Sequence, residues 1–394
     1  MLKVLSFLGN PHLNLKKNII ISGTNGKGTV ATILNKIYSD SGYKVGLYTS
    51  PHLIEITERI RISNKKIREK ILDRYLGKCI EASSSVNISL SFFELLTTSA
   101  ILYFSKKKND INIFEVGLGG KFDATNVIKS KIGIITNIEK DHVEFLGDSL
   151  KEIAYEKIGI TNIGSKLITS AKSESLKVFD KYCKKNQTQI FRINKDFSVS
   201  KKNKNFIYTS KELSFKFKSK LKGAHQNHNL GVAIKAIELS EKEYGLRINN
   251  LKLEKSLSEV FNPGRFQTVS KDPLLIIDIS HNIHSVKTLI ENYQLEYNKK
   301  KINIIIGMLK DKNPLDCIKL LKKIAKIIYL TEVPNERSFQ AKIIAEKLKN
   351  KNIHYIANNQ IPSILANNEE YLITGSIYLL GSILKKKYVK VDIN

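Results

Sequence analysis

The chain has few of the residues that stabilise secreted or metal-bound small domains. It contains three cysteines in 394 residues, Cys79, Cys183 and Cys317, and no tryptophan. The cysteines are odd in number, far apart and without x-x spacing to one another or to histidine, which argues against a disulfide framework and a zinc site. No apolar run reaches membrane-spanning length, and MLKVLSFLGNPHLNLKK has no signal-peptide cleavage site. We therefore expect a folded cytoplasmic protein with no membrane partner.

Arginine is also scarce. Lysine and arginine together number 65 against 37 acidic residues, a formal charge of +28, yet only eight of the 65 are arginine. The lysines are scattered along the chain among many asparagines and isoleucines, a composition typical of an AT-rich genome. Proteins that read nucleic acids concentrate their charge and use arginine forks. We expect no specific nucleic-acid partner, although non-specific, salt-dependent binding is in keeping with this charge.

The length exceeds one typical core, and 42% hydrophobic residues suffice to fill two. Short β-branched runs at 18–22, 44–49, 111–116 and 132–138 alternate with helical patterns, which predicts a parallel α/β sheet. Alternating segments between about 165 and 222 predict a small antiparallel sheet on the same domain, followed by a helix at 226–245. Pro263-Gly264 interrupts the pattern, and a second βα series follows, with strands expected within 274–280, 301–309, 326–333, 352–358 and 371–378. The expected domains are 1–262 and 263–394.

The segment ISGTNGKGTV, residues 21–30, lies between a buried-strand run and a helical pattern. This is the order of a P-loop, in which backbone N–H groups and a helix N-terminus hold phosphates. Lys27 would neutralise the transferred phosphoryl group, and Thr29 would reach Mg²⁺. Gly28, between the lysine and the hydroxyl residue, departs from the common form. A tight strand-to-helix turn is the simpler alternative. The candidate ATP-binding residues are Asn25, Gly26, Lys27, Gly28 and Thr29.

Polar residues end the next three strands. Ser50 follows 44–49, Glu115 lies in 111–116, and His142 follows 132–138. The carboxyl ends of parallel strands lie along one edge of a sheet, where ligands bind. Together with Thr29 these residues would form a phosphate and metal site, although one histidine is unusual for magnesium. Taken singly, each has a simpler explanation: a turn before Pro51, a carboxylate paired with a lysine, and a helix cap.

The stretch SLKEIAYEKIGI, residues 149–160, predicts an amphipathic helix. Ser149 and Glu152 form an S-x-x-E capping box. Lys157 falls on the apolar face, where an ammonium group is unfavourable without a partner. Sequence alone leaves two explanations open, a side chain that extends to solvent at the helix end, or a buried lysine with a chemical role.

In the second βα series, Arg265 and Asp278 are the candidate ligand contacts. Arg265 lies just after the Pro-Gly break, and Asp278 precedes His281-Asn282 after a strand. If the second domain closes over the first, the guanidinium would touch a phosphate and the carboxylate would accept from ribose hydroxyls. A surface arginine and a strand-end turn explain the pattern equally well.

Taken together, these segments resemble the folylpolyglutamate synthase and dihydrofolate synthase family of the Mur ligase superfamily. The match runs in order along nearly the whole chain, in GTNGKGT, TSPHLIEITERI, EVGLGGKFDATN, ITNIEKDHVEFLGDSLKEIAYEKIGI, GAHQNHN, PGRFQ, GMLKDKN and TGSIYLLG. The resemblance implies a P-loop parallel-sheet ATPase domain with a small antiparallel sheet, followed by a Rossmann-like C-terminal α/β domain. It also implies an ATP-dependent amide ligase that adds L-glutamate to dihydropteroate, a folate, or both.

The resemblance further implies roles for individual residues. Gly26, Lys27, Gly28 and Thr29 would bind ATP phosphates, and Asn229, Arg265 and Asp278 match other ATP contacts. Two Mg²⁺ ions would be held by Ser50, Glu115 and His142. The pterin pocket would include Phe93, Glu94 and Asp123. Lys157 matches a lysine that carries a CO₂-derived carbamate near the metal, so Lys27, His142 and Lys157 are the expected catalytic residues.

The implied reaction proceeds through an acyl phosphate, which the glutamate amine then attacks. Because acyl phosphates hydrolyse, we expect the domains to close around the break near 262. We expect a monomer whose partners are these small molecules.

Three differences from the family stand out. An N-terminal stretch that contributes to the dihydropteroate pocket of bifunctional members is short here, so dihydropteroate binding is expected only if the true start lies upstream or another segment substitutes. The usual D-G-A-H-N block reads DISHN at 278–282, and the tryptophan before P-G-R is absent. Two rival hypotheses are another Mur-type ligase acting on cell-wall nucleotide precursors and a degenerate, non-catalytic nucleotide-binding homologue.

Overall fold

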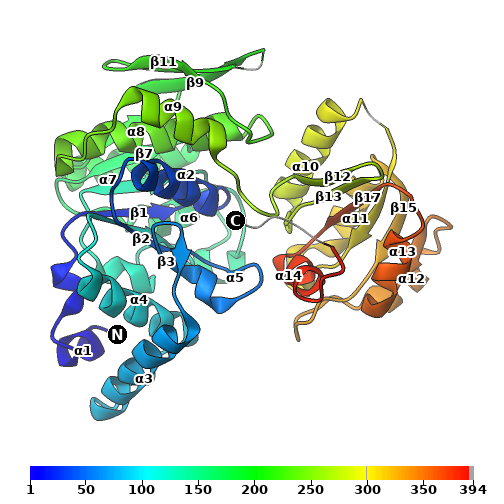
Figure 1. Ribbon diagram of the computed structural model, residues 1–394, viewed down its shortest axis with the longest axis horizontal. Coiled ribbons are helices and arrows are strands. Elements are labelled where there is room, and N and C mark those ends of the chain that lie inside the picture. Colours follow the sequence, from blue (N-terminus) through cyan, green and yellow to red (C-terminus); the bar gives the residue numbers. More distant parts are fainter. Residues whose placement is uncertain (204, 299, 390–394) are drawn as a thin grey trace. The chain divides into compact units, whose positions relative to one another are not determined.

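The chain forms two compact units. The computed structural model describes residues 1–203, 205–298 and 300–389. The first unit contains Met1–His52, Ile56–Leu221 and His225–Phe261, and the second contains Leu53–Glu55, Lys222–Ala224 and the chain from Asn262 onward. Each unit has a sheet of its own with helices around it (Figure 1).

A largely parallel sheet forms the centre of the first unit. Among the described residues its strands run in the order β4-β3-β2-β5-β1-β6-β7-β8. Strands β2, β5, β1, β6, β7 and β8 pair in parallel, while β3 and β4 form an antiparallel edge. The bounds are β1 Asn18–Ser22, β2 Val45–Tyr48, β3 Ile60–Ile62, β4 Lys65–Lys66, β5 Ile111–Glu115, β6 Ile132–Ile135, β7 Lys166–Thr169 and β8 Gln189–Arg192. The expected parallel α/β architecture is confirmed.

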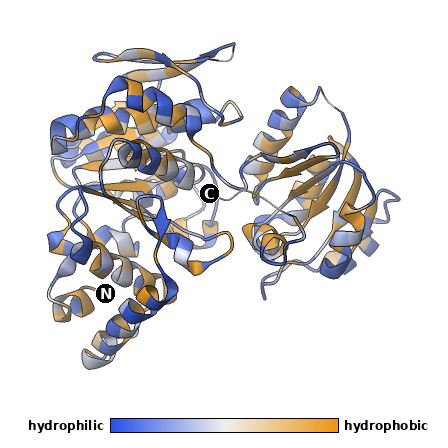
Figure 2. Ribbon diagram, viewed as in Figure 1, coloured by the Kyte–Doolittle hydropathy of each residue, from blue (hydrophilic) through white to orange (hydrophobic). Residues whose placement is uncertain are grey.

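Helices cover both faces of this sheet (Figure 2), which is why its central strands β1 and β5 are buried at every position. Helices α2, α8 and α9 contribute to the core on one face, and α1, α3, α4, α6 and α7 to the core on the other. The helices are α1 Leu2–Phe7, α2 Lys27–Asp40, α3 Glu69–Ser85, α4 Phe92–Lys107, α5 Val143–Leu146, α6 Leu150–Ile158, α7 Glu174–Lys185, α8 Gln226–Tyr244 and α9 Asn250–Glu259, with short 3₁₀ turns η1 Pro11–Asn14, η2 Ile56–Arg59 and η3 Ala124–Val127. The helix expected at 226–245 is confirmed as α8.

The small antiparallel sheet is shorter than the sequence suggested. It consists of β9 Phe197–Lys202, β10 Asn205–Ser210 and β11 Ser214–Phe217, in the order β11-β10-β9. The prediction was wrong for the beginning of the 165–222 segment, because β7 and β8 join the parallel sheet and α7 connects them. Short apolar runs look alike in both kinds of sheet, so the amphipathic helix between them was the better guide.

The second unit is also an α/β structure. Its strands lie in the order β12-β13-β17-β14-β15-β16 within the described residues, parallel except for the edge strand β12. The strands are β12 Gln267–Lys271, β13 Leu274–Ile277, β14 Ile302–Ile306, β15 Ala325–Leu330, β16 Ile353–Tyr355 and β17 Tyr371–Thr374. The helices are α10 Ile283–Glu296, α11 Pro314–Leu321, α12 Ala341–Leu348, α13 Ile361–Leu365 and α14 Ile377–Lys385, with η4 Lys310–Lys312 and η5 Asn358–Gln360. The five strands expected in the second series are present, and β12 is an addition.

The three cysteines are buried and unpaired. No helix among the described residues is both long and apolar enough to cross a membrane.

Candidate active site

The glycine-rich loop connects β1 to the N-terminus of α2, as the P-loop pattern predicts. Gly26 caps the helix with a φ of 88°, and Gly23 has a φ of 137°. Both are left-handed conformations that glycine adopts without strain. A Cβ atom at Gly23 would lie 1.9 Å from Oγ1 of Thr136, so glycine is also needed there for the close approach. The loop therefore depends on both the flexibility and the small size of its glycines.

Residues that follow β6 hold this loop in place. The Thr136 hydroxyl donates to the Asn25 carbonyl at 2.6 Å, and the side-chain oxygen of Asn137 accepts from the Asn25 N–H at 2.8 Å. The Thr24 N–H donates to the Asn137 carbonyl at 2.9 Å. These contacts give the ITN portion of ITNIEKDH a supporting role that the sequence did not reveal.

Glu115 lies beside both Ser50 and the P-loop. Glu115 is the last residue of β5 and is 4% exposed. Its carboxylate accepts a 3.0 Å hydrogen bond from the Ser50 N–H. A Cβ atom at Gly28 would be 3.5 Å from the nearer carboxylate oxygen. The structure thus brings Ser50, Glu115 and Gly28 together. The sheet-edge argument joined Ser50 and Glu115 with Thr29 and His142, and that larger group stays a prediction. Gly28 allows the carboxylate to approach the start of α2 closely.

Lys27 and Lys157 meet at one backbone oxygen. The ammonium group of Lys27 donates to the Gly23 carbonyl at 2.9 Å and to the Thr24 carbonyl at 3.3 Å. Nζ of Lys157, on a side chain that is 4% exposed, donates to the same Gly23 oxygen at 3.2 Å. Lys157 therefore faces the P-loop and does not extend to solvent, so the simpler of its two explanations was wrong.

The surroundings of Lys157 favour its neutral amine. Burial, reinforced by the charge of Lys27, lowers the pKa of Lys157 to about 7. The carboxylates of Asp141, Asp123 and Glu156 act in the opposite direction but do not prevail. A substantial fraction of this side chain is uncharged, and hence nucleophilic, near neutral pH.

This low pKa predicts a pH-dependent stability. The ordinary pKa is 10.5, so between about 7 and 10.5 the unfolded chain binds the lysine proton and the folded chain does not. Stability from this residue therefore rises with pH in that window. In CO₂-free buffer, the free energy of unfolding of the wild type relative to Lys157→Met should increase by roughly 1 kcal/mol per pH unit. Urea denaturation across the window measures it, and a constant difference would contradict it.

Lys157 is positioned by close packing at the end of α6. Ser149 and Glu152 form the predicted capping box at the helix start. At the other end, a Cβ atom at Gly120 would lie 2.8 Å from the Lys157 carbonyl oxygen and 2.9 Å from that of Glu156. The GLGG loop and the last turn of α6 thus touch backbone to backbone, which fixes the lysine relative to the strand end of β5.

His142 occupies a more open position. It precedes α5 with a φ of 52°, and its imidazole is 3.9 Å from the Asp141 carboxylate. Asp141 in turn acts electrostatically on Lys157, so this loop belongs to the same neighbourhood. In the described part of the chain, no three His, Cys, Asp or Glu side chains are grouped as a metal site. The magnesium ligands expected here, Ser50, Glu115 and His142, stay a prediction, and the imidazole among them is an unusual ligand for magnesium.

Asn229 reaches the P-loop from the second turn of another helix. A Cβ atom at Gly26 would lie 2.4 Å from its side-chain oxygen, and its amide nitrogen donates to Gln226 at 2.9 Å. The side chain is 6% exposed. The N-terminus of α8 is therefore placed against the nucleotide loop, where the family resemblance puts an ATP contact.

Phe93 packs against a glycine at the end of β5. A Cβ atom at Gly117 would lie 2.6 Å from Cζ of the ring, and the centroid of the Tyr48 ring is 5.8 Å from that of Phe93. Phe93 is half-buried near the start of α4. The ring is held between a buried aromatic and bare backbone, an arrangement that can present a flat face to a heterocycle.

Replacing Gly117 with alanine should displace this ring. We expect the overlap to lower the free energy of unfolding by about 1–3 kcal/mol and to weaken binding of a pterin-bearing substrate more than binding of ATP. The matched control is Gly77→Ala, on a helix and with no atom within 4 Å of the new methyl group. Equal KM changes for the two substrates would contradict a pterin role for Phe93. Urea denaturation and steady-state kinetics provide the measurements.

Glu94 and Asp123 each organise their own loop. The Glu94 carboxylate accepts from the Ser91 N–H at 2.9 Å as part of a capping box. The Asp123 carboxylate accepts from the N–H groups of Gly117, Leu118 and Thr125, each at 3.0 Å, and from the Thr125 hydroxyl at 2.6 Å. Four accepted bonds use most of the capacity of a carboxylate. A pterin contact for either residue remains a prediction.

Arg265 and Asp278 lie in the second unit. The Asp278 carboxylate accepts from the Phe266 N–H at 2.8 Å and from the Ser280 N–H at 2.7 Å. Burial raises the pKa of Asp278, although these bonds and the charge of Arg265 act against it. The carboxylate joins the turn that carries Arg265 to the end of β13. Their predicted phosphate and ribose contacts stay predictions.

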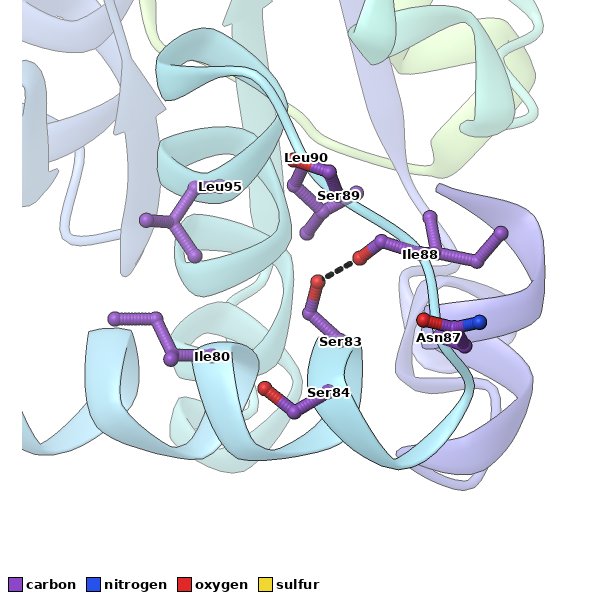
Figure 3. A pocket seen from close by; sticks show the side chains of 8 residues that line it. All are labelled: Ile80, Ser83, Ser84, Asn87, Ile88, Ser89, Leu90 and Leu95. Carbon is purple, nitrogen blue, oxygen red and sulfur yellow. Dashed lines mark hydrogen bonds between the residues drawn. The ribbon is translucent and has the colours of Figure 1, made fainter.

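A hollow of about 370 Å³ lies between α3 and the start of α4 (Figure 3). The Ser83 hydroxyl donates to the Ile88 carbonyl across it. The hollow contains none of the side chains predicted for the site and is lined by Ile80, Ser83, Ser84, Asn87, Ile88, Ser89, Leu90 and Leu95.

Comparison with known proteins shows the family to which the chain belongs. Residues 21–237 match the Mur ligase middle domain, and residues 264–370 match the Mur ligase, glutamate ligase domain. The chain therefore belongs to the Mur ligase family of ATP-dependent ligases.

Within that family the chain is similar to dihydrofolate synthase/folylpolyglutamate synthases. The chain is 34% identical over 384 residues to the dihydrofolate synthase/folylpolyglutamate synthase of Buchnera aphidicola subsp. Schizaphis graminum, covering 95% of this chain and 89% of that protein. The Escherichia coli enzyme FolC in complex with DHPP and ADP superposes with a TM-score of 0.89 at 26% identity, covering 98% and 92% of the two chains. The bifunctional Yersinia pestis enzyme with AMPPNP and a Mn ion gives 0.88 at 27% identity, with the same coverage. The chain is thus of the dihydrofolate synthase/folylpolyglutamate synthase type.

Proposed function

We propose that this chain joins L-glutamate to dihydropteroate, to a reduced folate, or to both, with ATP as the energy source. The observation that carries the proposal is the convergence of Lys27, Lys157 and the carboxylate of Glu115 on the P-loop, in a chain that matches nearly the whole length of a relative named for these two activities. The proposed domain division at residue 262 lies close to the boundary between the two compact units.

The proposed reaction has two displacements. An oxygen of the substrate carboxylate attacks the γ-phosphorus of ATP, and ADP leaves. The amine of glutamate then attacks the acyl carbon, phosphate leaves, and the amine loses its proton. Lys27 would turn from the Gly23 carbonyl to the phosphates, where its charge stabilises the transferred group. The backbone N–H groups at the start of α2 orient the phosphate chain.

Ser50, Glu115 and His142 are the residues we propose as ligands of magnesium, with two ions expected. Mg²⁺ would supply charge neutralisation for the phosphoryl oxygens. Lys157 would carry a carbamate formed from its neutral amine and CO₂, since burial favours that amine. The anion so formed would orient a cation beside the P-loop. The remaining proposed ATP contacts are Asn25, Gly26, Gly28, Thr29, Asn229, Arg265 and Asp278. The proposed pterin contacts are Phe93, Glu94 and Asp123.

The test is ATP hydrolysis coupled to substrate. Purified chain with ATP, Mg²⁺ and L-glutamate should release phosphate when dihydropteroate or tetrahydrofolate is added, and a comparison of the two defines whether one or both activities are present. If phosphate is released with UDP-linked cell-wall precursors but with neither dihydropteroate nor tetrahydrofolate, the chain would be assigned to another Mur-type ligase. ATP binding without turnover of any of these would indicate a non-catalytic homologue.

We further propose that the protein acts as a cytoplasmic monomer with these small molecules as its partners and no specific nucleic-acid ligand. The scattered lysines and the scarcity of arginine support the absence of a specific nucleic-acid ligand. Size-exclusion chromatography with light scattering tests the oligomeric state.

A further inference from the structure

The turn that carries Arg265 contains a strained residue. Phe266 has a φ of 46°, a left-handed conformation that is unfavourable for a bulky side chain. In the described part of the chain, the other non-glycine residues with positive φ are Asn, Ser, Lys, Gln and His, so Phe266 is the only aromatic one. Such strain persists only where the surrounding structure holds it, and it is frequent at functional sites.

The two halves of this turn are fixed in different ways. Pro263 and Gly264 occupy its central positions, Gly264 with a φ of 70°, and the Arg265 N–H donates to the Asn262 carbonyl at 3.3 Å. Phe266 is 5% exposed, and its ring packs in the core of the second unit. Arg265 lies between these two anchored parts and is itself half-buried.

Two side chains hold the peptide N–H groups on either side of Arg265. Before it, Oε1 of Gln267 accepts from the buried N–H of Gly264 at 2.9 Å. After it, Oδ2 of Asp278 accepts from the N–H of Phe266 at 2.8 Å. The direction in which the Arg265 side chain leaves the backbone therefore depends on these two acceptors.

Gln267 connects this turn to the sheet. It is the first residue of β12, is 8% exposed, and pairs with Ile277 of β13. Asp278 is also among the proposed ATP contacts, so its replacement would test two roles at once. Gln267 has no proposed ligand contact, so its replacement isolates the support of the turn.

From these contacts we propose that Gln267 is a positioning residue for Arg265. The inference rests on the proposed function, in which Arg265 contacts an ATP phosphate. Without the Gln267 oxygen, the Gly264 N–H would be buried and unpaired, which is unfavourable. The turn would rearrange to pair it, the strained conformation of Phe266 would relax, and the guanidinium would lose its fixed direction. Catalysis depends on such preorganisation, because small displacements of a contacting group have large effects on rate.

A double-mutant cycle between Gln267 and Arg265 tests this role. The quantity measured is kcat/KM for ATP, at saturating glutamate and pterin substrate. Gln267→Met keeps the length of the side chain without its oxygen and should lower kcat/KM by about ten- to a hundredfold, since a displacement of about 1 Å can cost about a hundredfold. In an Arg265→Ala background the same change should have an effect of about twofold or less, because the group to be positioned is absent. Gln267→Glu, which keeps an acceptor oxygen, should recover part of the loss.

The matched control is the next residue of the same strand. Thr268→Val removes the 3.2 Å hydrogen bond between the hydroxyls of Thr268 and Tyr297 and leaves the turn untouched, so kcat/KM for ATP should not change. Urea denaturation of each variant checks that it is folded. If Gln267→Met does not fold, Gln267→Asn, which withdraws the oxygen by one methylene group, takes its place in the cycle.

Each outcome supports or refutes the role of Gln267. An unchanged kcat/KM in Gln267→Met refutes it, and so does a loss that persists in full in the Arg265→Ala background, which would indicate general packing. Wild-type kcat/KM in Arg265→Ala also refutes it, because there would be no contact to position. These three results leave the proposed function intact. A wild type without turnover of dihydropteroate or tetrahydrofolate overturns the proposed function and this inference together.

Discussion

Replacing Gly23 with alanine is expected to abolish ATP-dependent turnover. The new methyl group would lie 1.9 Å from the Thr136 hydroxyl and 3.0 Å from its backbone nitrogen, and the φ of 137° is one that alanine rarely adopts. Overpacking and backbone strain each cost about 1–3 kcal/mol, and both fall on the loop that would hold the phosphates. The Gly23 carbonyl would move as well, removing the acceptor shared by Lys27 and Lys157.

A matched variant separates strain from overlap. Gly42 has a φ of 94° and no atom within 4 Å of a new methyl group. Gly42→Ala should therefore lose only about 1 kcal/mol of stability and bind ATP as the wild type does. Urea denaturation and ATP titration of both variants give the comparison. Normal ATP affinity in Gly23→Ala would show that the loop does not form the nucleotide site.

Replacing Lys157 with alanine is expected to lower kcat by roughly a hundred- to a thousandfold, the usual loss when one preorganised electrostatic group is removed. The side chain is buried at the P-loop with a pKa of about 7, and its proposed carbamate would be replaced by a methyl group. Small carboxylates such as acetate or propionate should partly restore turnover, because they supply the missing anion in the space left by the side chain.

Two controls test whether the loss of activity is specific to Lys157. Lys151→Ala, on the exposed side of the same helix, should leave kcat unchanged. Isotopic labelling with ¹³C-bicarbonate should give a carbamate signal in the wild type that Lys157→Ala lacks. Full activity in Lys157→Ala would return the residue to a packing role, while low activity without rescue or a carbamate signal would remove the modification from the proposal.

The sequence predicted the parts of the fold that depend on local pattern. Runs such as NIIIS and INIFE are mostly apolar and are buried at every position because helices cover both faces of their sheet, and the apolar run is visible without a structure. The hairpin β3–β4 was missed because it is short and polar, with Lys65 and Lys66 exposed at the sheet edge. The segments β7 and β8 were assigned to the wrong sheet, since four-residue strands do not reveal their partners.

The sequence also predicted those residues of the candidate site that follow from local pattern, and it missed those that depend on tertiary packing. Helical periodicity located Lys157, and strand ends located Ser50 and Glu115, because both follow from repeat geometry. The backbone contact of Gly120 with α6 depends on tertiary packing and leaves no local trace. The capping role of Glu94, in contrast, follows from a local motif, because Ser91 and Glu94 form an S-x-x-E capping box that is visible in the sequence. The roles of Thr136 and Asn137 could be recognised only in the structure, because these residues follow β6 and support a loop more than a hundred residues away in the sequence.

The shared oxygen of Gly23 has a consequence for the order of ligand recognition. Two amino groups, one cationic and one near its own midpoint of titration, converge on a single uncharged acceptor. Lys27 and a protonated Lys157 therefore repel each other at the ligand-free loop, in surroundings that screen charge poorly. An anion bound at the loop would relieve that repulsion, so we expect inorganic phosphate, pyrophosphate and ADP to compete for it. We expect such a site to respond first to the charge of a ligand and only afterwards to the identity of its nucleotide.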